Sequence, residues 1–565
     1  MISIFIGSIF SSVILISSGL IFIKFFFGKK LINIDPWIAG IYGFITLGFF
    51  SLILNFFFPI NKFIGTLFLL FSIVIFFFYF YNFKKKTELA LIIIFVSVFT
   101  LIFITSANIN RPDAGLYHLP FISILQENKI MLGLTNLHYR LGHTSIFQYI
   151  SAIYNNYFFK IEFLNLPLAS LFPLFIVFLF KKINEAFKTK NEVKIISIFF
   201  IIIFSFYSFS RYSNFGNDAP ASIFFFILII SILNIKDIKH LKLNKFYNIA
   251  IISIFLITLK PSMLVVLPLP ILLFLINKKK FTILKHKNSL ICLVLIFSWI
   301  LKNSLISGCL IFPLKETCLS NLSYYNGSVV DIASNEAEAW SKGFPDSVKK
   351  MNFVEYNSDF NWINTWFENH FNKVKEKLFP LLIFIIIFLA KNIINRSFYK
   401  NFNFQNIVNN KSVIMIIIFS FYCSIFWFLK FPVYRLGMSF LATLIIFTFI
   451  AIFISKHKTL YSKKIYITII GVGLVLITIK NLNRIIDNYD LVYNNSPWPK
   501  IYSMNDNGSN FEKVFKKVSN GNGNFVYYYS GGQECMYSKS PCSNYYKKDL
   551  KRKKDNGYTI FYLNK

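Results

Sequence analysis

The chain has 565 residues, of which 55% are hydrophobic, and its formal net charge is +34. A soluble domain is less apolar than this, and apolar runs of about 20 residues recur along the chain, which indicates a polytopic α-helical membrane protein. The lysines stand in tight groups between these runs, as cytoplasmic loops require, so the positive charge does not indicate a nucleic-acid partner.

The predicted spans follow from the rule that basic loops stay in the cytoplasm. Residues 3–23 are apolar, lack the basic segment that opens a signal peptide, and end at a group of three lysines, so the N-terminus is predicted outside. The long apolar run 247–277 is predicted to break into two short spans at LKPS, because Pro261 lacks the N–H that a continuing helix needs. Every lysine-rich short loop then falls on one side when the chain has about fourteen spans.

The predicted fold is an all-α polytopic membrane protein with a small C-terminal extracytoplasmic α/β domain. Residues 1–480 form the transmembrane domain, with an outer-loop site at 105–160 and a second large outer loop at 307–377, and residues 481–565 form the tail domain. Within the first loop, residues 115–127 and 144–159 are expected to form helices lying along the membrane surface. In the tail, 511–518 has helical spacing, and 524–530 and 558–563 read as strands.

Four of the six cysteines stand in two close pairs outside the predicted spans. Cys309 and Cys318 share one polar loop, and Cys535 and Cys542 share the tail. Such pairs are candidate disulfides on an oxidising side of a membrane, and free thiols are the alternative.

Ionisable residues are sparse in the predicted outer loops, and charge held beside a bilayer tends to mark function. The richest stretch is TSANINRPDAGLYHLPFISILQENKIMLGLTNLHYRLGH, residues 105–143. An acid in such a loop can deprotonate an acceptor hydroxyl, and basic groups can hold a leaving phosphate. The catalytic candidates are Asp113 and His118, and the substrate-binding candidates are Arg111, His138, Arg140, His143, Asp218, Lys260 and Arg435.

Each candidate has a structural alternative. The two acids could cap the helices that follow them, and Arg140 could anchor the chain at the lipid headgroups. His118 could bind sugar, lipid phosphate or a metal, or fill a polar notch. His138 and His143 are five residues apart, which is not the i, i+4 spacing of a helical zinc pair. No cofactor is implied, and a requirement for a divalent metal stays open.

Short motifs in a fixed order carry a resemblance to a known superfamily. They are RPDAGLYHLP (111–120), NLHYRLGHTS (136–145), NDAPAS (217–222), LKPS (259–262), WILKNSLISGCLIFP (299–313) and CMYSKSPC (535–542). With them the chain resembles the GT-C-type integral membrane glycosyltransferases, which use polyprenyl-phosphate-linked sugars, and more closely a group of uncharacterised multispan bacterial membrane proteins.

The resemblance implies a base at Asp113 and phosphate ligands at Lys260 or Arg435. The implied partners are the lipid bilayer, a polyprenyl-phosphate sugar donor, and a glycan, lipid or protein acceptor. The implied location is the bacterial inner (plasma) membrane, with both termini extracytoplasmic. Two features depart from the superfamily. Many of its members have paired acids in this loop, whereas Asp113 is followed by Ala114. Three or four predicted spans also precede the loop, where fewer are usual.

The predicted function is transfer of a sugar from a polyprenyl phosphate to an acceptor on the outer face, in cell-envelope glycan or lipid modification. A transporter or lipid flippase would also have many spans and broken helices, but it would bury ionisable residues within its spans, where this sequence has few. A surface-polysaccharide polymerase would share the chemistry and differ in its acceptor. A nonenzymatic scaffold is the remaining alternative.

Overall fold

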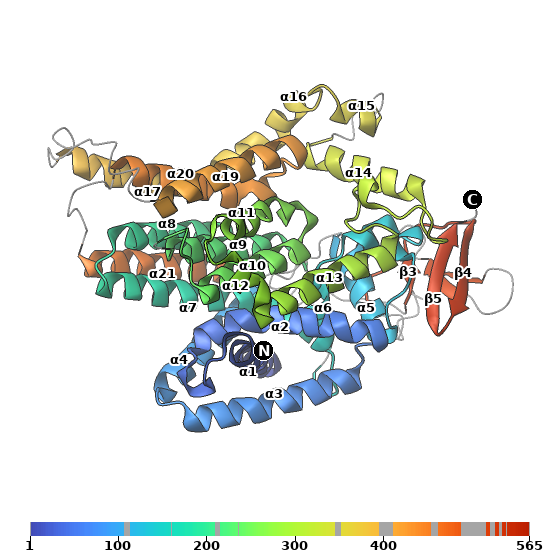
Figure 1. The fold of residues 1–565 in the computed structure, drawn as a ribbon, viewed down its shortest axis with the longest axis horizontal. Coiled ribbons are helices and arrows are strands. Elements are labelled where there is room, and N and C mark those ends of the chain that lie inside the picture. The colour runs from blue at the N-terminus through green and yellow to red at the C-terminus, as the bar shows by residue number, and fades with distance from the viewer. Residues whose placement is uncertain are drawn as a thin grey trace.

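The computed structural model describes residues 2–106, 113–159, 161–209, 215–235, 237–344, 352–394, 411–453, 462–487, 516–519, 526–529, 534–537 and 540–563. These residues form a helical bundle with a small amount of β-structure at the C-terminal end (Figure 1). Nine helices of the described part are long and apolar enough to cross a membrane, which makes this a helical membrane protein. They are α1 (Ile2–Phe27), α2 (Pro36–Phe57), α3 (Lys62–Asn82), α4 (Lys86–Thr105), α7 (Leu166–Lys188), α13 (Lys287–Ser307), α19 (Lys411–Lys430), α20 (Tyr434–Phe453) and α21 (Lys463–Asp487).

The remaining helices are shorter or carry more charge. They are α5 (Leu119–Glu127), α6 (Ile146–Ile153), α8 (Glu192–Ser208), α9 (Asp218–Leu233), α10 (Leu243–Leu259), α11 (Pro268–Ile276), α12 (Lys280–Lys285), α14 (Gly327–Ser341), α15 (Phe353–Asn357), α16 (Ile363–Trp366) and α17 (Asn372–Ile394). Several of them coincide with predicted spans, but α9 and α10 fall short of the length that marks a span, so the count of about fourteen stays a prediction.

The first two helices cross at a very short distance because glycines face each other. A Cβ placed on Gly19 would overlap the carbonyl of Ala39, and one placed on Gly43 would overlap the backbone of Leu15. Small residues at such crossings let two backbones approach closely, which strengthens van der Waals packing where lipid is as apolar as the side chains.

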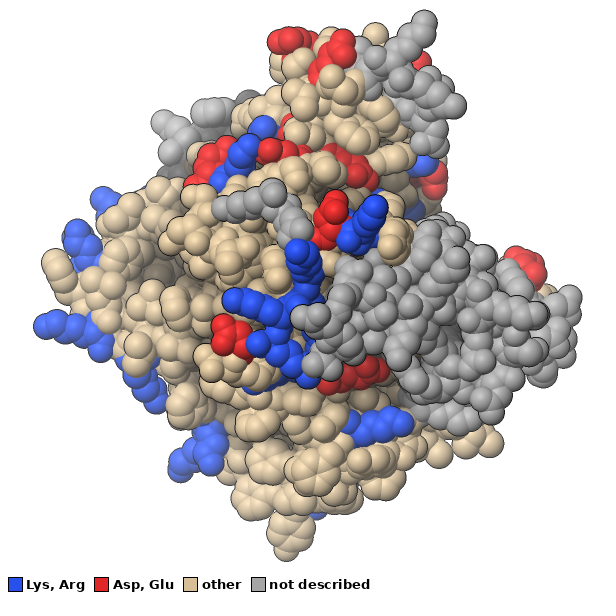
Figure 2. Space-filling model, turned by 90° about the vertical axis from the view of Figure 1, so that its right-hand side faces the viewer, with Lys and Arg blue, Asp and Glu red and all other residues tan. Residues whose placement is uncertain are grey.

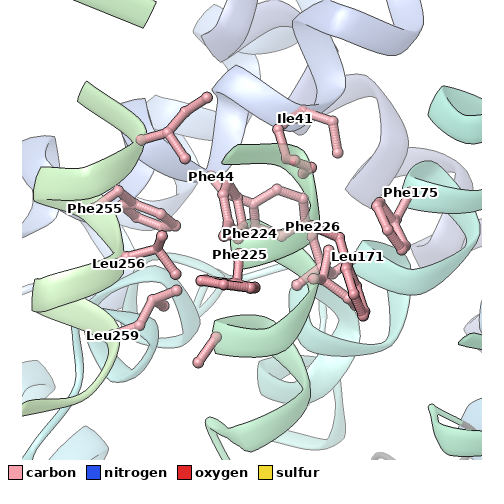
Figure 3. Packing of buried hydrophobic residues seen from close by; sticks show 14 of the residues in the cluster. Ile41, Phe44, Leu171, Phe175, Phe224, Phe225, Phe226, Phe255, Leu256 and Leu259 are labelled. Carbon is pink, nitrogen blue, oxygen red and sulfur yellow. The ribbon is translucent and has the colours of Figure 1, made fainter. Parts of the chain in front are cut away.

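The centre of the bundle is filled by aromatic rings. Phe224, Phe225 and Phe226 of α9 are all fully buried, and the rings from α2, α7 and α10 surround them (Figure 3). Phe224 lies 4.6 Å from Phe255 of α10 and Phe225 lies 4.8 Å from Phe440 of α20, measured between ring centroids. This packing fixes the N-terminal end of α9, where Asp218 stands, against α10 and α20.

The predicted interruption after residue 259 is present. α10 ends at Leu259, Lys260 has an extended backbone, and the chain continues as a 3₁₀ turn, Pro261–Val266, before α11. Proline at the start of the turn removes the N–H that would have continued α10. The break exposes the Lys260 side chain at the end of the helix.

Two helices that were expected to lie along the membrane surface are buried instead. Residues 119–126 of α5 and all of α6 are buried. α6 packs against α2 and α5, and the C-terminal tail covers the loop that follows α5, so neither helix has a free polar face. Their apolar residues pack against other parts of the protein. An amphipathic sequence pattern cannot distinguish such packing from contact with a lipid surface.

The tail carries β1 (Lys516–Ser519), β2 (Val526–Tyr529) and β3 (Cys542–Ser543) in one sheet and β4 (Leu550–Asp555) and β5 (Tyr558–Leu563) in a hairpin. β1 and β2 are antiparallel, whereas β2 and β3 are parallel. The hairpin turns at Asn556-Gly557, both with positive φ (46° and 76°), the conformation that an Asn-Gly turn favours. The predicted strands 524–530 and 558–563 contain β2 and β5. The predicted helix is wrong at 516–518, which pair with β2, and its residues 511–515 lie outside the described part.

The tail lies on the first large loop. The Phe561 amide donates to the Leu132 carbonyl at 2.9 Å, and the Leu132 amide donates to the Thr559 carbonyl at 2.8 Å, so the loop makes a single parallel β-bridge with β5. The hairpin and the C-terminus lie together at one end of the molecule (Figure 1).

Candidate functional site

Six charged side chains from distant segments form two ion-paired groups, which we call the charged cluster. In the first group, Arg140 lies 3.8 Å from Asp113 and 3.5 Å from Glu336 of α14. In the second group, Asp218 at the start of α9 uses one carboxylate oxygen for Lys260 and the other for Arg435 of α20, the latter at 3.5 Å. Each half of the cluster therefore holds acids and bases in contact.

Tyr117 links the two groups. The charges of Asp113 and Arg140 from one group, and of Asp218 and Arg435 from the other, all act on its phenol. Burial, assisted by the two acids, raises the pKa of Tyr117, so it stays a neutral hydrogen-bonding group. The two groups therefore both lie near the same buried side chain, Tyr117.

Asp113 precedes a π-helical turn, Ala114–His118, of the kind that is frequent at functional sites. Its side chain caps no backbone N–H, so the alternative role as a helix cap is not the one observed. The carboxylate is 42% exposed and its contact with Arg140 is long, which leaves it accessible to a ligand. Arg111, two residues earlier, lies outside the described residues.

His118 is buried and held by an amide. The Oε1 atom of Gln148 accepts the Ser145 amide at 2.6 Å, which fixes the orientation of the Gln148 amide group. Its Nε2 atom therefore faces His118 Nδ1, and since an amide nitrogen only donates, the imidazole proton stands at Nε2. Burial, with the nearby charge of Lys260, lowers the pKa of His118 to about 3, so the ring is neutral.

The other two loop histidines are also neutral. His138 Nδ1 accepts the Arg140 amide at 3.1 Å, and burial lowers the pKa of His138 to about 3. His143 packs against Phe312 with ring centroids 5.1 Å apart, and burial lowers its pKa to about 4. Within the described residues, no group of three His, Cys, Asp or Glu side chains has the arrangement of a metal site.

Two charged residues were not singled out from the sequence: Glu336 of the cluster, and Lys302, whose charge acts on His143. Glu336 anchors Arg140 and also accepts the Tyr139 hydroxyl. Lys302 of α13 is fully buried, with its Nζ 3.1 Å from Asn303 Oδ1 and 4.0 Å from the Trp299 ring centroid. Lys302 could have been found from the sequence, because it is a lone lysine inside an apolar run. Glu336 could not, because nothing in the sequence distinguishes it from the other acids of its stretch.

The tail forms part of the surroundings of the site. The Met536 amide donates to the Gly115 carbonyl at 2.9 Å, inside the π-helical turn that follows Asp113. A Cβ on Gly115 would overlap the side chains of Glu534 and Met536, so a larger residue there would require the tail side chains to shift. Both candidate cysteine pairs are bonded in the structure, and Cys535–Cys542 closes the loop that makes this contact.

A family model described as a domain of unknown function, DUF8201, matches residues 1–442. The chain belongs to this family. The matched range includes all six members of the charged cluster and ends before the tail. No curated protein and no solved structure matches the chain.

Proposed function

We propose that the protein is a membrane glycosyltransferase that moves a sugar from a polyprenyl phosphate to an acceptor at the charged cluster. The observation that carries the proposal is the proximity of two ion-paired groups that both act on Tyr117. One group holds the accessible acid Asp113, and the other holds the cations Lys260 and Arg435 on Asp218. Such a transfer needs a base on one side of the sugar and cations at the leaving phosphate on the other.

In the proposed reaction, Asp113 takes the proton of an acceptor hydroxyl while that oxygen forms a bond to the anomeric carbon of the donor sugar. The bond from that carbon to the phosphate oxygen breaks, and the polyprenyl phosphate leaves with the electron pair. A positioned base contributes typically 10²–10⁴-fold to such a step.

Lys260 and Arg435 would stabilise the leaving phosphate. Because Asp218 already pairs with both of them, they are oriented before a donor binds, and preorganised charge is what stabilises a developing anion most effectively. The neutral His118, with its proton at Nε2 and Lys260 nearby, would add a hydrogen bond to donor or acceptor.

Glu336 supports the assignment of Asp113 as the base. The residue after Asp113 is an alanine and not a second acid, but α14 brings a second acid, Glu336, to the arginine that pairs with Asp113. Arg140 lies closer to Glu336 than to Asp113, so we assign Glu336 to holding Arg140 and leave Asp113 to act as the base.

The proposed location is the bacterial inner membrane, with both termini and the charged cluster on the extracytoplasmic side. The first large loop, which carries Asp113 and Arg140, contacts both the tail and the segment closed by the Cys309–Cys318 disulfide. The tail holds the second disulfide, and disulfides persist on oxidising sides of membranes.

The test is transfer by the purified protein in lipid nanodiscs, with a panel of polyprenyl phosphates that carry radiolabelled sugars. Asp113→Asn should lower the rate by about 10²-fold or more while donor binding stays unchanged. The matched control is Asp331→Asn, because Asp331 is 45% exposed and also ion-paired, at 2.8 Å to Lys315, but lies outside the cluster. Equal transfer by Asp113→Asn and wild type would remove Asp113 as the base, and movement of donor lipid across the bilayer without transfer would favour a flippase.

A further inference from the structure

The tail hairpin carries a dense row of positive charge. Between residues 547 and 554, six side chains are basic and one, Asp549, is acidic. Figure 2 shows Lys and Arg side chains gathered near the middle of the face that the hairpin occupies. We call these six residues the basic row; they are Lys547, Lys548, Lys551, Arg552, Lys553 and Lys554.

The row is larger than protection of an edge strand requires. Among the described residues β4 pairs with β5 on one side only, and lysines on such an edge prevent pairing with other chains. Here the cations occupy both faces of β4, with Lys551 and Lys553 on one and Arg552 and Lys554 on the other, and continue into the preceding loop.

The basic row continues to the charged cluster. Lys547 Nζ donates to the Asn136 carbonyl at 2.8 Å, and its charge acts on His138. The Tyr545 ring lies 5.0 Å from His138, whose Nδ1 accepts the Arg140 amide. Arg140 in turn pairs with Asp113, so a chain of contacts leads from the basic row to the proposed base.

We propose that the basic row binds an anionic glycan, a chain with repeated phosphodiester or uronate charges, and that this glycan is the acceptor of the transfer. That the glycan is the acceptor rests on the proposed function, whereas the binding of an anionic glycan by the basic row does not. A six-residue strand extends about 20 Å, which suits a chain of charges rather than a single phosphate.

Two observations favour a glycan over a membrane surface. Tyr545 and Tyr546 beside the row are 45% and 55% exposed, and tyrosine rings can stack on sugars while their hydroxyls hydrogen-bond. The hairpin lies at the end of the molecule with the C-terminus, whereas α3 and α13 run along the bundle (Figure 1). These two helices carry large exposed apolar side chains.

The test measures binding of a fluorescent poly(glycerol phosphate) oligomer to the full chain in nanodiscs of neutral lipid, with neutral dextran as the comparison ligand. The triple variant Lys551→Gln/Lys553→Gln/Lys554→Gln should bind the oligomer at least about tenfold more weakly, and wild-type affinity should fall as salt rises. The matched control is Lys278→Gln/Lys279→Gln/Lys280→Gln, three exposed lysines of another loop, which should bind like wild type.

The outcomes separate this proposal from the proposed function. Unchanged oligomer binding by the tail triple variant, or binding of phosphatidylglycerol vesicles in preference to the oligomer, would overturn the glycan surface. Oligomer binding without any sugar transfer would support the basic row as a glycan-binding surface and contradict the proposed transferase. Equal transfer to anionic acceptors by the triple variant and wild type would support the transferase and contradict the basic row as its acceptor site.

Discussion

Replacing Asp218 with asparagine should destabilise the protein and impair transfer together, because one carboxylate holds two cations. At 3.5 Å, the contact between Arg435 and Asp218 is worth about 5 kcal/mol at an effective dielectric constant of 20. Solvent lowers this value, since the side chains of Asp218, Lys260 and Arg435 are 23%, 31% and 48% exposed. Exposed pairs contribute about 0–1 kcal/mol and broken buried pairs cost about 3–5, so we expect a net loss of about 2 kcal/mol in the free energy of unfolding.

The assay compares thermal unfolding and sugar transfer of Asp218→Asn with those of Asp331→Asn. The Asp331 pair is shorter, at 2.8 Å, but both of its side chains are about half exposed, at 58% and 45%, so its loss should cost little. Combining Asp218→Asn with Lys260→Met should recover part of the stability, because it removes one of two cations left facing each other. Equal losses of stability in Asp218→Asn and Asp331→Asn would refute the reasoning. So would a loss in the double variant equal to the sum of the losses in Asp218→Asn and Lys260→Met.

Three further outcomes are expected. Burial holds the pKa of three loop histidines well below the ordinary value of 6.5, at about 3, 3 and 4 for His118, His138 and His143. Because the folded chain keeps these rings neutral while the unfolded chain binds the protons, their contribution to the free energy of unfolding is complete above pH 6.5 and is progressively lost as the pH falls toward 4. The expected loss at pH 5 is on the order of 1–2 kcal/mol per histidine. Thermal unfolding from pH 8 to pH 5 measures this loss, and a flat profile would contradict it. Gly115→Ala should displace Glu534 and the tail, at a cost of about 1–3 kcal/mol, and expose the tail to limited proteolysis, whereas Gly471→Ala, which has nothing within 4 Å, should not. Lys302→Met should leave stability unchanged or raise it by about 1 kcal/mol, because a buried cation is exchanged for an apolar side chain of similar length; a large loss of stability in the same unfolding assay would show that the charge is structurally required.

The sequence predicted the class of the protein and many of its local elements. Apolar runs and lysine groups predicted a helical membrane protein, Pro261 predicted the break after α10, and the β-branched and aromatic residues of 558–563 predicted β5. These features depend on composition, on backbone geometry and on the preference of side chains for a strand, all of which are local. The candidate residues were also visible, since an ionisable side chain beside an apolar run is conspicuous wherever it stands.

Tertiary structure decided which of those residues meet. Asp218 could have capped α9, but packing of the α9 phenylalanines against α10 and α20 places Lys260 and Arg435 at its carboxylate. Glu336 reaches Arg140 across almost 200 residues, and the tail reaches Gly115 across more than 400, so neither contact leaves a local trace. α5 and α6 have the apolar residues of surface helices and are buried because other parts of the chain cover them. Local sequence determines what each segment prefers, whereas contacts between distant segments depend on the whole bundle, because their free energy is gained only when all the packed faces are in place.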